Sequence, residues 1–322
     1  MPRRPSETHE PGKEEFALSP ISAYQRLPEP QADVEAGDVF LQNSSVQKFG
    51  WDNIDVQVRD KKQGLKVILS KNAGQVAAGQ VLALIGPSGS GKSTLLNVLA
   101  NRSKLRHSGT ISIDGDTVSP AQIRQVSSYV EQDNVQIGGL TVEETLHFAS
   151  RLASPDTDRA VRKARTDGIL RALGLVEQRN SVVSPLLHAG ISGGQRRRLG
   201  LGTALVTGPK ILFLDEPTSG LDSAASHQVI SFLTKIAKRH RLVIIASIHQ
   251  PSASTFDLFD LVTLISKGKT CYHGPRKNIS DHFSTILPDL EFKDSADHLL
   301  DLVNTDFESH AEREREARGI NL

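Results

Sequence analysis

The stretch Val81–Thr94 reads VLALIGPSGSGKST and decides the fold of this chain. It begins as a short, continuous apolar run, which is typical of a strand buried on both faces of a parallel sheet. A glycine-rich turn follows, and after it LLNVL places apolar residues at helical spacing. The turn fits the pattern G-x-x-x-x-G-K-[ST], in which backbone N–H groups converge on anionic oxygens. The strand before the turn and the helix after it are the surroundings that a phosphate-binding loop requires.

The residues of this predicted phosphate loop have distinct roles. Lys92 would reach the outer phosphates of a nucleoside triphosphate, and Ser93 would offer its hydroxyl to Mg²⁺. A Gly/Ser-rich turn that matches the pattern by chance is the alternative, and the flanking strand and helix argue against it. The predicted nucleotide-binding residues of the loop are Gly86, Pro87, Ser88, Gly89, Ser90, Gly91, Lys92, Ser93 and Thr94.

A second apolar stretch, ILFLDE, ends in the carboxylates Asp215 and Glu216. In parallel sheets, ligands lie at the carboxyl ends of the strands. We therefore expect Asp215 to hold Mg²⁺ and Glu216 to orient or deprotonate an attacking water. Taken alone, such a pair is equally typical of the acidic first turn of a helix. Its position after a phosphate loop favours the catalytic interpretation.

Composition excludes several classes of protein. Of 322 residues, 38% are hydrophobic and 23% charged, which is typical of a globular chain rather than a disordered one. Lys and Arg number 38 against 37 Asp and Glu, so a general nucleic-acid-binding role is not expected. The single Cys excludes an internal disulfide framework and suits a reducing compartment. No apolar run approaches the about 20 residues of a membrane span, so we expect this stretch of chain to be soluble and to face the cytosol.

The chain divides into segments of different character. Residues 1–38 hold six of the 15 prolines and predict a disordered, acidic tail. Residues 39–304 predict a globular domain that is rich in antiparallel strands at first, with Phe49 and Trp51 packed at a strand edge. A helical subdomain is expected over about 141–207, where Thr141 and Glu144 have the spacing of a capping box. Residues 305–322 predict a polar linker.

Strands return in the second half of the domain and alternate with helices, which implies parallel βαβ units. The predicted fold is therefore α/β, a P-loop NTPase core with an antiparallel β subdomain and an α-helical insertion. The strands expected in this half are Lys210–Leu214, Leu242–Ser247 and Leu261–Ser266.

A glycine pair provides a further signal between the two motifs, in GISGGQRRRLG. Ser192, Gly193 and Gly194 precede a helix-forming stretch whose free N–H groups suit an anion, although an ordinary capped helix start fits as well. SGGQ after a phosphate loop and shortly before LDEP resembles the ATP-binding cassette family. The family's motifs appear in the family's order, and the resemblance covers about residues 51–304.

The resemblance implies roles for residues that mean little alone. Gln132 in YVEQDN matches the family's Q-loop and would be both a catalytic residue and a ligand of Mg²⁺. His249 in IASIHQPS matches the switch histidine, and Asp222 matches the D-loop. The predicted signature residues, which would face the nucleotide of a partner domain, are Ser192, Gly193, Gly194 and Gln195.

The subfamily can be narrowed. IHQPS and the segment SADHLLDLVN at Ser295–Asn304 resemble the G subfamily, which includes the white and pleiotropic-drug-resistance types. The resemblance implies the ATP-hydrolysing domain of a transporter, with ATP and Mg²⁺ as cofactors. It also implies two partners, a second such domain in an ATP sandwich and a transmembrane domain at the cytoplasmic face of a membrane. Val58 falls where most cassettes carry the aromatic residue that stacks on adenine.

Two alternative functions are also compatible with the sequence. A soluble cassette protein acting on translation or chromosomes is one, although the single cassette and the lack of a sustained heptad pattern disfavour it. A truncated or non-transporting module is another, although Glu216 and His249 are intact. The run Arg196–Arg198 predicts a solvated helix face, because successive helical residues point in different directions. Asp222 would also cap the helix Ser223–Lys238, and Cys271 would pack in a hairpin without chemistry.

Overall fold

The computed structural model describes residues 41–60, 64–132, 136–183, 190–286 and 296–303. These ranges belong to one compact unit that extends over Glu35–Leu322. The predicted tail at residues 1–38 and the predicted linker at residues 305–322 lie outside the described residues.

Ten strands and nine α-helices occur in the described ranges, and a short 3₁₀ turn lies at Arg276–Asn278. The strands are β1 (Lys48–Asp60), β2 (Gly64–Ala77), β3 (Val81–Ile85), β4 (His107–Ile113), β5 (Asp116–Thr117), β6 (Ser127–Val130), β7 (Ile211–Asp215), β8 (Val243–Ser247), β9 (Leu261–Ser266) and β10 (Lys269–Pro275). The helices are α1 (Lys92–Leu99), α2 (Pro120–Val126), α3 (Val142–Ala153), α4 (Arg159–Ala172), α5 (Gly193–Leu205), α6 (Ser223–His240), α7 (Ala253–Phe256), α8 (Ile279–Ile286) and α9 (Ala296–Val303).

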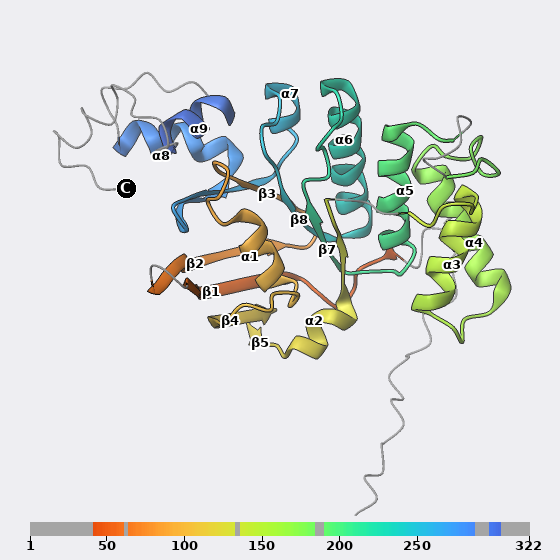
Figure 1. The fold of residues 1–322 in the computed structure, drawn as a ribbon, viewed down its shortest axis with the longest axis horizontal. Coiled ribbons are helices and arrows are strands. Elements are labelled where there is room, and N and C mark those ends of the chain that lie inside the picture. The colour runs from red at the N-terminus through yellow and green to blue at the C-terminus, as the bar shows by residue number, and fades with distance from the viewer. Residues whose placement is uncertain (1–40, 61–63, 133–135, 184–189, 287–295, 304–322) are drawn as a thin grey trace, which may run out of the picture. The chain divides into compact units, whose positions relative to one another are not determined.

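The strands form two sheets (Figure 1). One has six strands in the order β10-β9-β3-β8-β7-β6, in which β9, β3, β8, β7 and β6 are parallel and β10 is antiparallel to β9. The other is antiparallel, with the order β2-β1-β4-β5. This arrangement confirms the predicted α/β fold and its antiparallel β subdomain.

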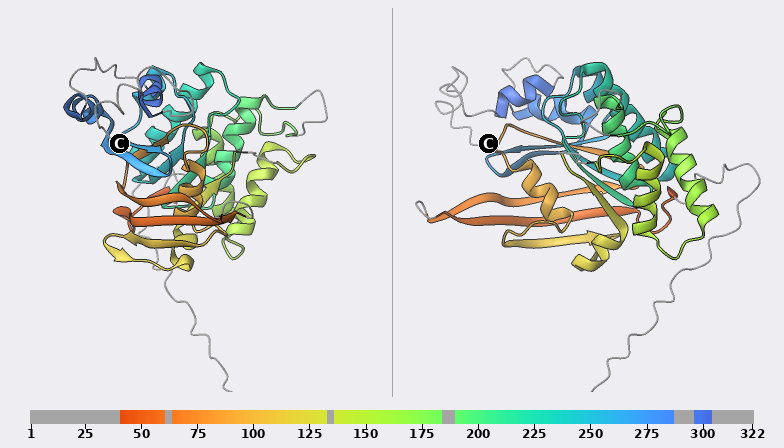
Figure 2. Two further views of the ribbon diagram at one scale, coloured as in Figure 1. Left: turned by 60° about the vertical axis from the view of Figure 1, so that its left-hand side comes forward. Right: turned by 45° about the vertical axis from the view of Figure 1, so that its right-hand side comes forward.

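Helix α1 lies between the two sheets (Figure 2). Its buried Leu95 and Leu96 belong to the same apolar cluster as Leu82 and Leu84 of β3. Phe49 and Trp51 of β1 also belong to that cluster, at 0% and 3% exposure, so the expectation that they pack at a strand edge was wrong. The Phe49 ring lies 5.7 Å from the Phe213 ring of β7, and the Trp51 ring lies 5.7 Å from the His273 ring of β10, so both rings pack against the six-stranded sheet.

Two of the strands that carry the predicted motifs, β3 and β8, are buried throughout. All five residues of β3 and all five of β8 are buried, as the continuous apolar runs predict. The register pairs Asp215, the last residue of β7, with Ser247, the last residue of β8. Because neighbouring strands end at the same level, the residues that follow them meet at one edge of the sheet.

Helices α3, α4 and α5 pack together beside β6 and β7 (Figure 1). The predicted capping box at Thr141 is present, and the Glu144 N–H donates to the Thr141 hydroxyl at 3.2 Å. Gly202 of α5 lies so close to α4 that a Cβ there would approach the Leu173 side chain to 2.7 Å. The predicted helical stretch therefore folds as a packed group of helices.

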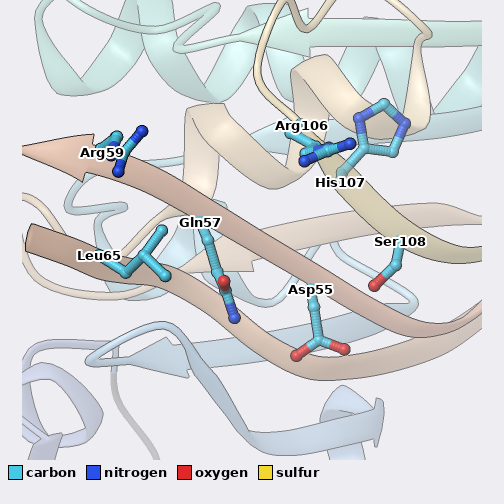
Figure 3. A pocket seen from close by; sticks show the side chains of 7 residues that line it. All are labelled: Asp55, Gln57, Arg59, Leu65, Arg106, His107 and Ser108. Atoms are coloured by element: carbon cyan, nitrogen blue, oxygen red, sulfur yellow. The ribbon is translucent and has the colours of Figure 1, made fainter.

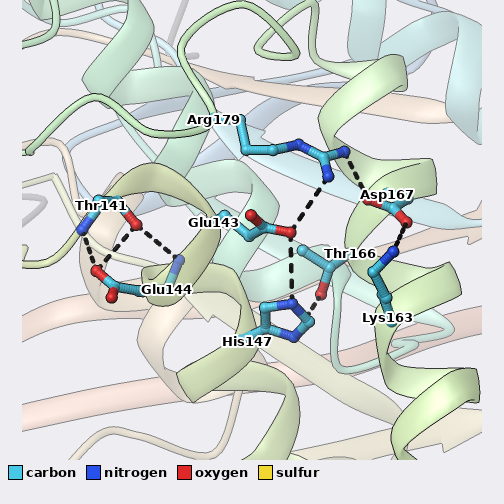
Figure 4. Close-up of polar contacts among 8 residues, drawn as sticks. All are labelled: Thr141, Glu143, Glu144, His147, Lys163, Thr166, Asp167 and Arg179. Carbon is cyan, nitrogen blue, oxygen red and sulfur yellow. Dashed lines mark hydrogen bonds and ion pairs between the residues drawn. The ribbon is translucent and has the colours of Figure 1, made fainter.

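A polar network joins α3 and α4 on their outer side (Figure 4). The Arg179 guanidinium donates to Glu143 of α3 at 3.3 Å and to Asp167 of α4 at 2.6 Å. His147 lies 3.6 Å from the Glu143 carboxylate, and Lys163 lies 3.8 Å from Asp167. One arginine thus connects the two helices through one acidic residue of each.

Candidate nucleotide-binding site

The loop between β3 and α1 has the geometry of a phosphate loop. Gly89 and Gly91 have φ angles of 75° and 106°, in the left-handed region that side chains disfavour. A Cβ on Gly86 would lie 2.1 Å from the Ile265 carbonyl oxygen, so the chain can pass there only as glycine. The loop then enters α1 directly, and its N–H groups join the positive end of the helix dipole.

Two side chains of this loop fit a bound phosphate. Lys92 is 6% exposed, and its ammonium donates to the carbonyl oxygens of Gly86 at 2.7 Å and Pro87 at 2.9 Å. Burial lowers the pKa of Lys92, while the nearby Glu216 and Asp215 carboxylates act to raise it. The Ser90 hydroxyl is buried without a hydrogen-bond partner. A buried hydroxyl without a partner and a buried ammonium in the same loop are groups that an anion can satisfy.

Asp215 is the centre of a network of hydroxyl groups. Its Oδ1 accepts hydrogen bonds from Ser93 at 2.9 Å and from Ser247 at 2.6 Å, and its Oδ2 accepts one from Tyr129 at 3.2 Å. Burial and the Asp215 charge raise the pKa of Tyr129 above its ordinary value, so this phenol stays a donor. Ser93 and Asp215 are in direct contact, and both carry oxygen atoms of the kind that Mg²⁺ prefers as ligands. The Gln132 side chain, the third predicted ligand, contacts Glu216.

Glu216 follows β7 in a constrained conformation. Its φ of 45° lies in the left-handed region, which costs a non-glycine residue about 1–2 kcal/mol. Its backbone N–H donates to the Ser247 hydroxyl at 2.9 Å. Its Oε2 accepts a hydrogen bond from the Gln132 side chain at 2.7 Å. The structure therefore brings Glu216 and Gln132, which lie 84 residues apart in sequence, into direct contact.

His249 lies near Glu216, beyond the end of β8. Both line an open hollow of about 400 Å³ that also includes Ser219 and Leu221. The other lining residues are Thr218, Ser223, Ser226, Gln250, Pro251, Ser252 and Thr255. This hollow is bounded by the segments that follow β7 and β8.

The residues at the start of α5 lie apart from this group. Ser192 and Gln195 form a capping box, in which the Gln195 N–H donates to the Ser192 hydroxyl at 3.2 Å. A Cβ built on Gly193 or Gly194 would meet no atom within 4 Å, so the helix end is open. Asp222 caps α6 by accepting the Ala225 N–H at 2.7 Å. Among the described residues, no hydrogen bond links the α5 start to the phosphate loop.

Three residues make contacts in the site that were not predicted. Ser247 and Tyr129 donate to Asp215, and their positions at the ends of β8 and β6 were the only signal that could have indicated this. Arg197 was expected on a solvated face with its neighbours, and that expectation was wrong. Its side chain is half-buried, and it donates to the carbonyl oxygens of Gln132 at 2.6 Å and Ser219 at 2.9 Å.

A second hollow, of about 580 Å³, lies on the antiparallel sheet (Figure 3). None of the predicted site residues lines it. Its lining comes from β1, β2 and the start of β4, and consists of Asp55, Gln57, Arg59, Leu65, Arg106, His107 and Ser108.

Two features are absent from the described ranges. No helix there has both the length and the apolar character needed to cross a bilayer. Within the same ranges, no three His, Cys, Asp or Glu side chains cluster in a way that could hold a metal ion.

Comparison with known proteins gives consistent results. Residues 69–219 match the family model described as ABC transporter, a range that includes the phosphate loop and Glu216. The chain is 38% identical over 283 residues to ABC transporter G family member 1 of Petunia hybrida, covering 87% of this chain and 44% of that protein.

Two further relatives agree with this result. ABC transporter G family member 20 of Arabidopsis thaliana is 39% identical over 247 residues, 76% of this chain and 33% of that protein. The broad substrate specificity ATP-binding cassette transporter ABCG2 of Rattus norvegicus is 41% identical over 249 residues, 76% of this chain and 37% of that protein. The chain spans less than half the length of these relatives.

Proposed function

Because this chain carries a nucleotide-binding domain of the ABC transporter G family, we propose that it binds ATP with Mg²⁺ and hydrolyses it to drive transport across a membrane. The observation that carries the proposal is the convergence of the β7 end on the phosphate loop. Ser93 of the loop contacts Asp215 at 2.9 Å, and Glu216 beside it contacts Gln132 at 2.7 Å.

Binding of the triphosphate would use residues 86–94. The N–H groups of the loop and the start of α1 would surround the phosphate oxygens, and Lys92 would exchange its two carbonyl contacts for the outer phosphates. The Ser90 hydroxyl would gain the partner it lacks. Lys92 would thus replace contacts within the loop by charge-assisted hydrogen bonds to the ligand, and Ser90 would gain a new one.

The metal would be held by Ser93, Asp215 and Gln132. When bound, Mg²⁺ neutralises charge on the phosphates during transfer. The hydroxyls of Ser247 and Tyr129 keep the Asp215 carboxylate oriented toward Ser93.

Hydrolysis would be carried by Glu216. Its carboxylate would accept a proton from the attacking water, and Gln132 would hold that carboxylate in place. His249, in the same hollow, would donate a hydrogen bond to the outer phosphate. Most of the rate enhancement in phosphoryl transfer comes from positioning and charge, and these residues supply both.

The partner domain would be bound through the start of α5. In an ATP sandwich, Ser192, Gly193, Gly194 and Gln195 would face the nucleotide held by a second domain of the same kind. The open helix end offers N–H groups and a positive dipole to that phosphate. Asp222 would lie at the same interface. A transmembrane domain would convert the closing and opening of the pair into transport.

The proposal is tested by Glu216→Gln. The amide has a similar shape but cannot accept a proton, so turnover should fall by about two orders of magnitude or more while ATP affinity is retained. Binding is measured by calorimetry and turnover by phosphate release. Glu131→Gln is the matched control, because Glu131 is also an acid at a strand end but ion-pairs with Arg102. Turnover of Glu216→Gln at the wild-type rate would refute the proposal.

A further inference from the structure

Arg197 connects three segments that are distant in sequence. It lies in the second turn of α5, just beyond Ser192 and Gln195. One Nη donates to the Gln132 carbonyl, 65 residues away, and the other donates to the Ser219 carbonyl, 22 residues away. These two acceptors follow β6 and β7, so the helix is attached to the edge of the sheet where the strand ends meet.

The same acceptor segments both contact Glu216. The Gln132 side chain donates to Glu216 Oε2 at 2.7 Å, and the Ser219 N–H donates to the Glu216 carbonyl oxygen at 3.1 Å. The hydrogen bonds therefore form a closed ring that runs from Arg197 through Gln132, Glu216 and Ser219 and back to Arg197. A displacement of α5 would therefore shift the groups that hydrogen-bond to the Glu216 side chain and to its carbonyl oxygen.

Arginine suits this position for a physical reason. Its planar guanidinium carries two Nη groups that diverge, so one side chain can donate to two carbonyl oxygens in different directions. A lysine ammonium is a point donor on a flexible stem, and holds two separated acceptors with less geometric control. Both bonds are charge-assisted, which makes them stronger than bonds between neutral groups.

We propose that Arg197 is a positioning residue that ties the start of α5 to the backbone at Gln132 and Ser219, and so makes the orientation of Glu216 depend on the position of α5. The inference rests on the proposed function, in which Glu216 acts in hydrolysis and the start of α5 faces a partner's nucleotide. Through this ring, an event at one end of α5 reaches the catalytic carboxylate within the same chain. Arg197 itself need not touch the nucleotide.

The test compares Arg197→Ala and Arg197→Lys with the wild-type chain. In Arg197→Ala, kcat should fall by about tenfold, while the Kd for ATP should stay within about twofold. Amide hydrogen exchange should become faster in the peptides that contain Gln132 and Ser219. Arg197→Lys should give an intermediate kcat, because one ammonium replaces a two-pronged donor.

Arg162→Ala is the matched control. Arg162 of α4 also donates to two backbone carbonyl oxygens, those of Pro155 and Thr157, but both belong to the turn just before its own helix. Its loss should leave kcat and the exchange of the two site peptides unchanged. This control distinguishes the loss of a link between distant segments from the general effect of removing a guanidinium.

The outcomes decide the proposal. A wild-type kcat in Arg197→Ala, or unchanged exchange in both peptides, would overturn it. If Arg197→Ala does not fold, Arg197→Lys decides in its place, where wild-type kcat and wild-type exchange would be the contrary result. If the wild-type chain itself does not hydrolyse ATP, the proposed function fails, and the exchange measurement still decides whether Arg197 ties the segments.

Discussion

The strand-end site and the α5 start differ in whether their polar groups are satisfied within the chain. The strand-end site comprises Lys92, Ser93, Gln132, Asp215 and Glu216, and all five make hydrogen bonds within the chain. The α5 start comprises residues 192–195, and its two glycines face open space. The first region is held together by its own polar groups, whereas the second offers its groups outward.

This difference indicates which properties each region controls. A self-satisfied polar cluster keeps its geometry in one chain, so binding of nucleotide at the strand-end site should need no partner. An open helix end has N–H groups that gain from a negative charge brought by another molecule. The comparison predicts that changes at the strand-end site alter binding or chemistry, and that changes at the α5 start alter association.

The largest effect is expected for Lys92→Ala. Loss of the one ammonium within the loop removes charge-assisted bonds to phosphate and should weaken ATP binding by roughly two orders of magnitude or more. Calorimetry with MgATP measures the change. Lys235→Ala, an exposed lysine on α6, is the control and should bind as the wild type does. Unchanged affinity in folded Lys92→Ala would show that the loop does not bind the phosphates.

The complementary change is Gly194→Asp at the α5 start. Aspartate in the first turn of a helix is favourable for folding, so the chain should remain stable and bind ATP normally. The added charge would repel a partner's phosphate, so ATP-dependent dimers should disappear in analytical ultracentrifugation. Glu216→Gln is the background in which those dimers should accumulate. Gly194→Ala adds only a methyl group in open space and should weaken dimers less.

Persistence of ATP-dependent dimers in Gly194→Asp would contradict the prediction that the α5 start controls association. A loss of ATP affinity in that variant would contradict the prediction that nucleotide binding depends on the strand-end site alone, since the α5 start would then act on binding within its own chain.

A smaller effect is expected for Ser247→Ala, within the strand-end site. The Ser247 hydroxyl donates to Asp215 and accepts the Glu216 N–H, so its loss frees both. The strained backbone of Glu216 would relax, and kcat should fall by about tenfold with little change in ATP affinity. Ser150→Ala is the control, because Ser150 is equally buried but its hydroxyl has no partner. A loss of ATP affinity in Ser247→Ala as large as the loss expected for kcat would mean that Ser247 serves binding instead.

The role of Ser247 also shows what could be predicted from the sequence. The β3–loop–α1 unit, the carboxylates at the end of β7 and the caps at Thr141, Ser192 and Asp222 are local patterns, and the structure contains each of them. Local chemistry within a few residues sets such features, so a single sequence is enough to predict them.

The contacts that the sequence did not predict depend on strand order and register. Ser247 meets Asp215 because β8 lies beside β7 and the two strands end together. Tyr129 meets the same carboxylate because β6 lies on the other side of β7. Arg197 reaches Gln132 and Ser219 only once α5 has packed against the sheet. Long-range pairing decides these contacts, and no local pattern encodes it.

The smallest effect is expected for Arg179→Ala, away from both regions. This arginine joins α3 to α4 through Glu143 and Asp167, with side chains that are 20–30% exposed. Because solvent screens such pairs, the free energy of unfolding should fall by only about 1 kcal/mol. Chemical denaturation measures the loss, and added salt should reduce the difference between variant and wild type.

Arg179→Ala sharpens the comparison because it loosens the helices without touching the strand-end site. ATP affinity should be unchanged. Turnover should fall if packing against α3 and α4 sets the position of α5. Arg151→Ala, which removes a charge from the exposed face of α3, is the control and should leave stability within about 0.5 kcal/mol of the wild type. A weaker ATP affinity in Arg179→Ala would show that the strand-end site depends on the helical region even for binding. ATP binding, and not only turnover, would then be coupled to the helices within a single chain.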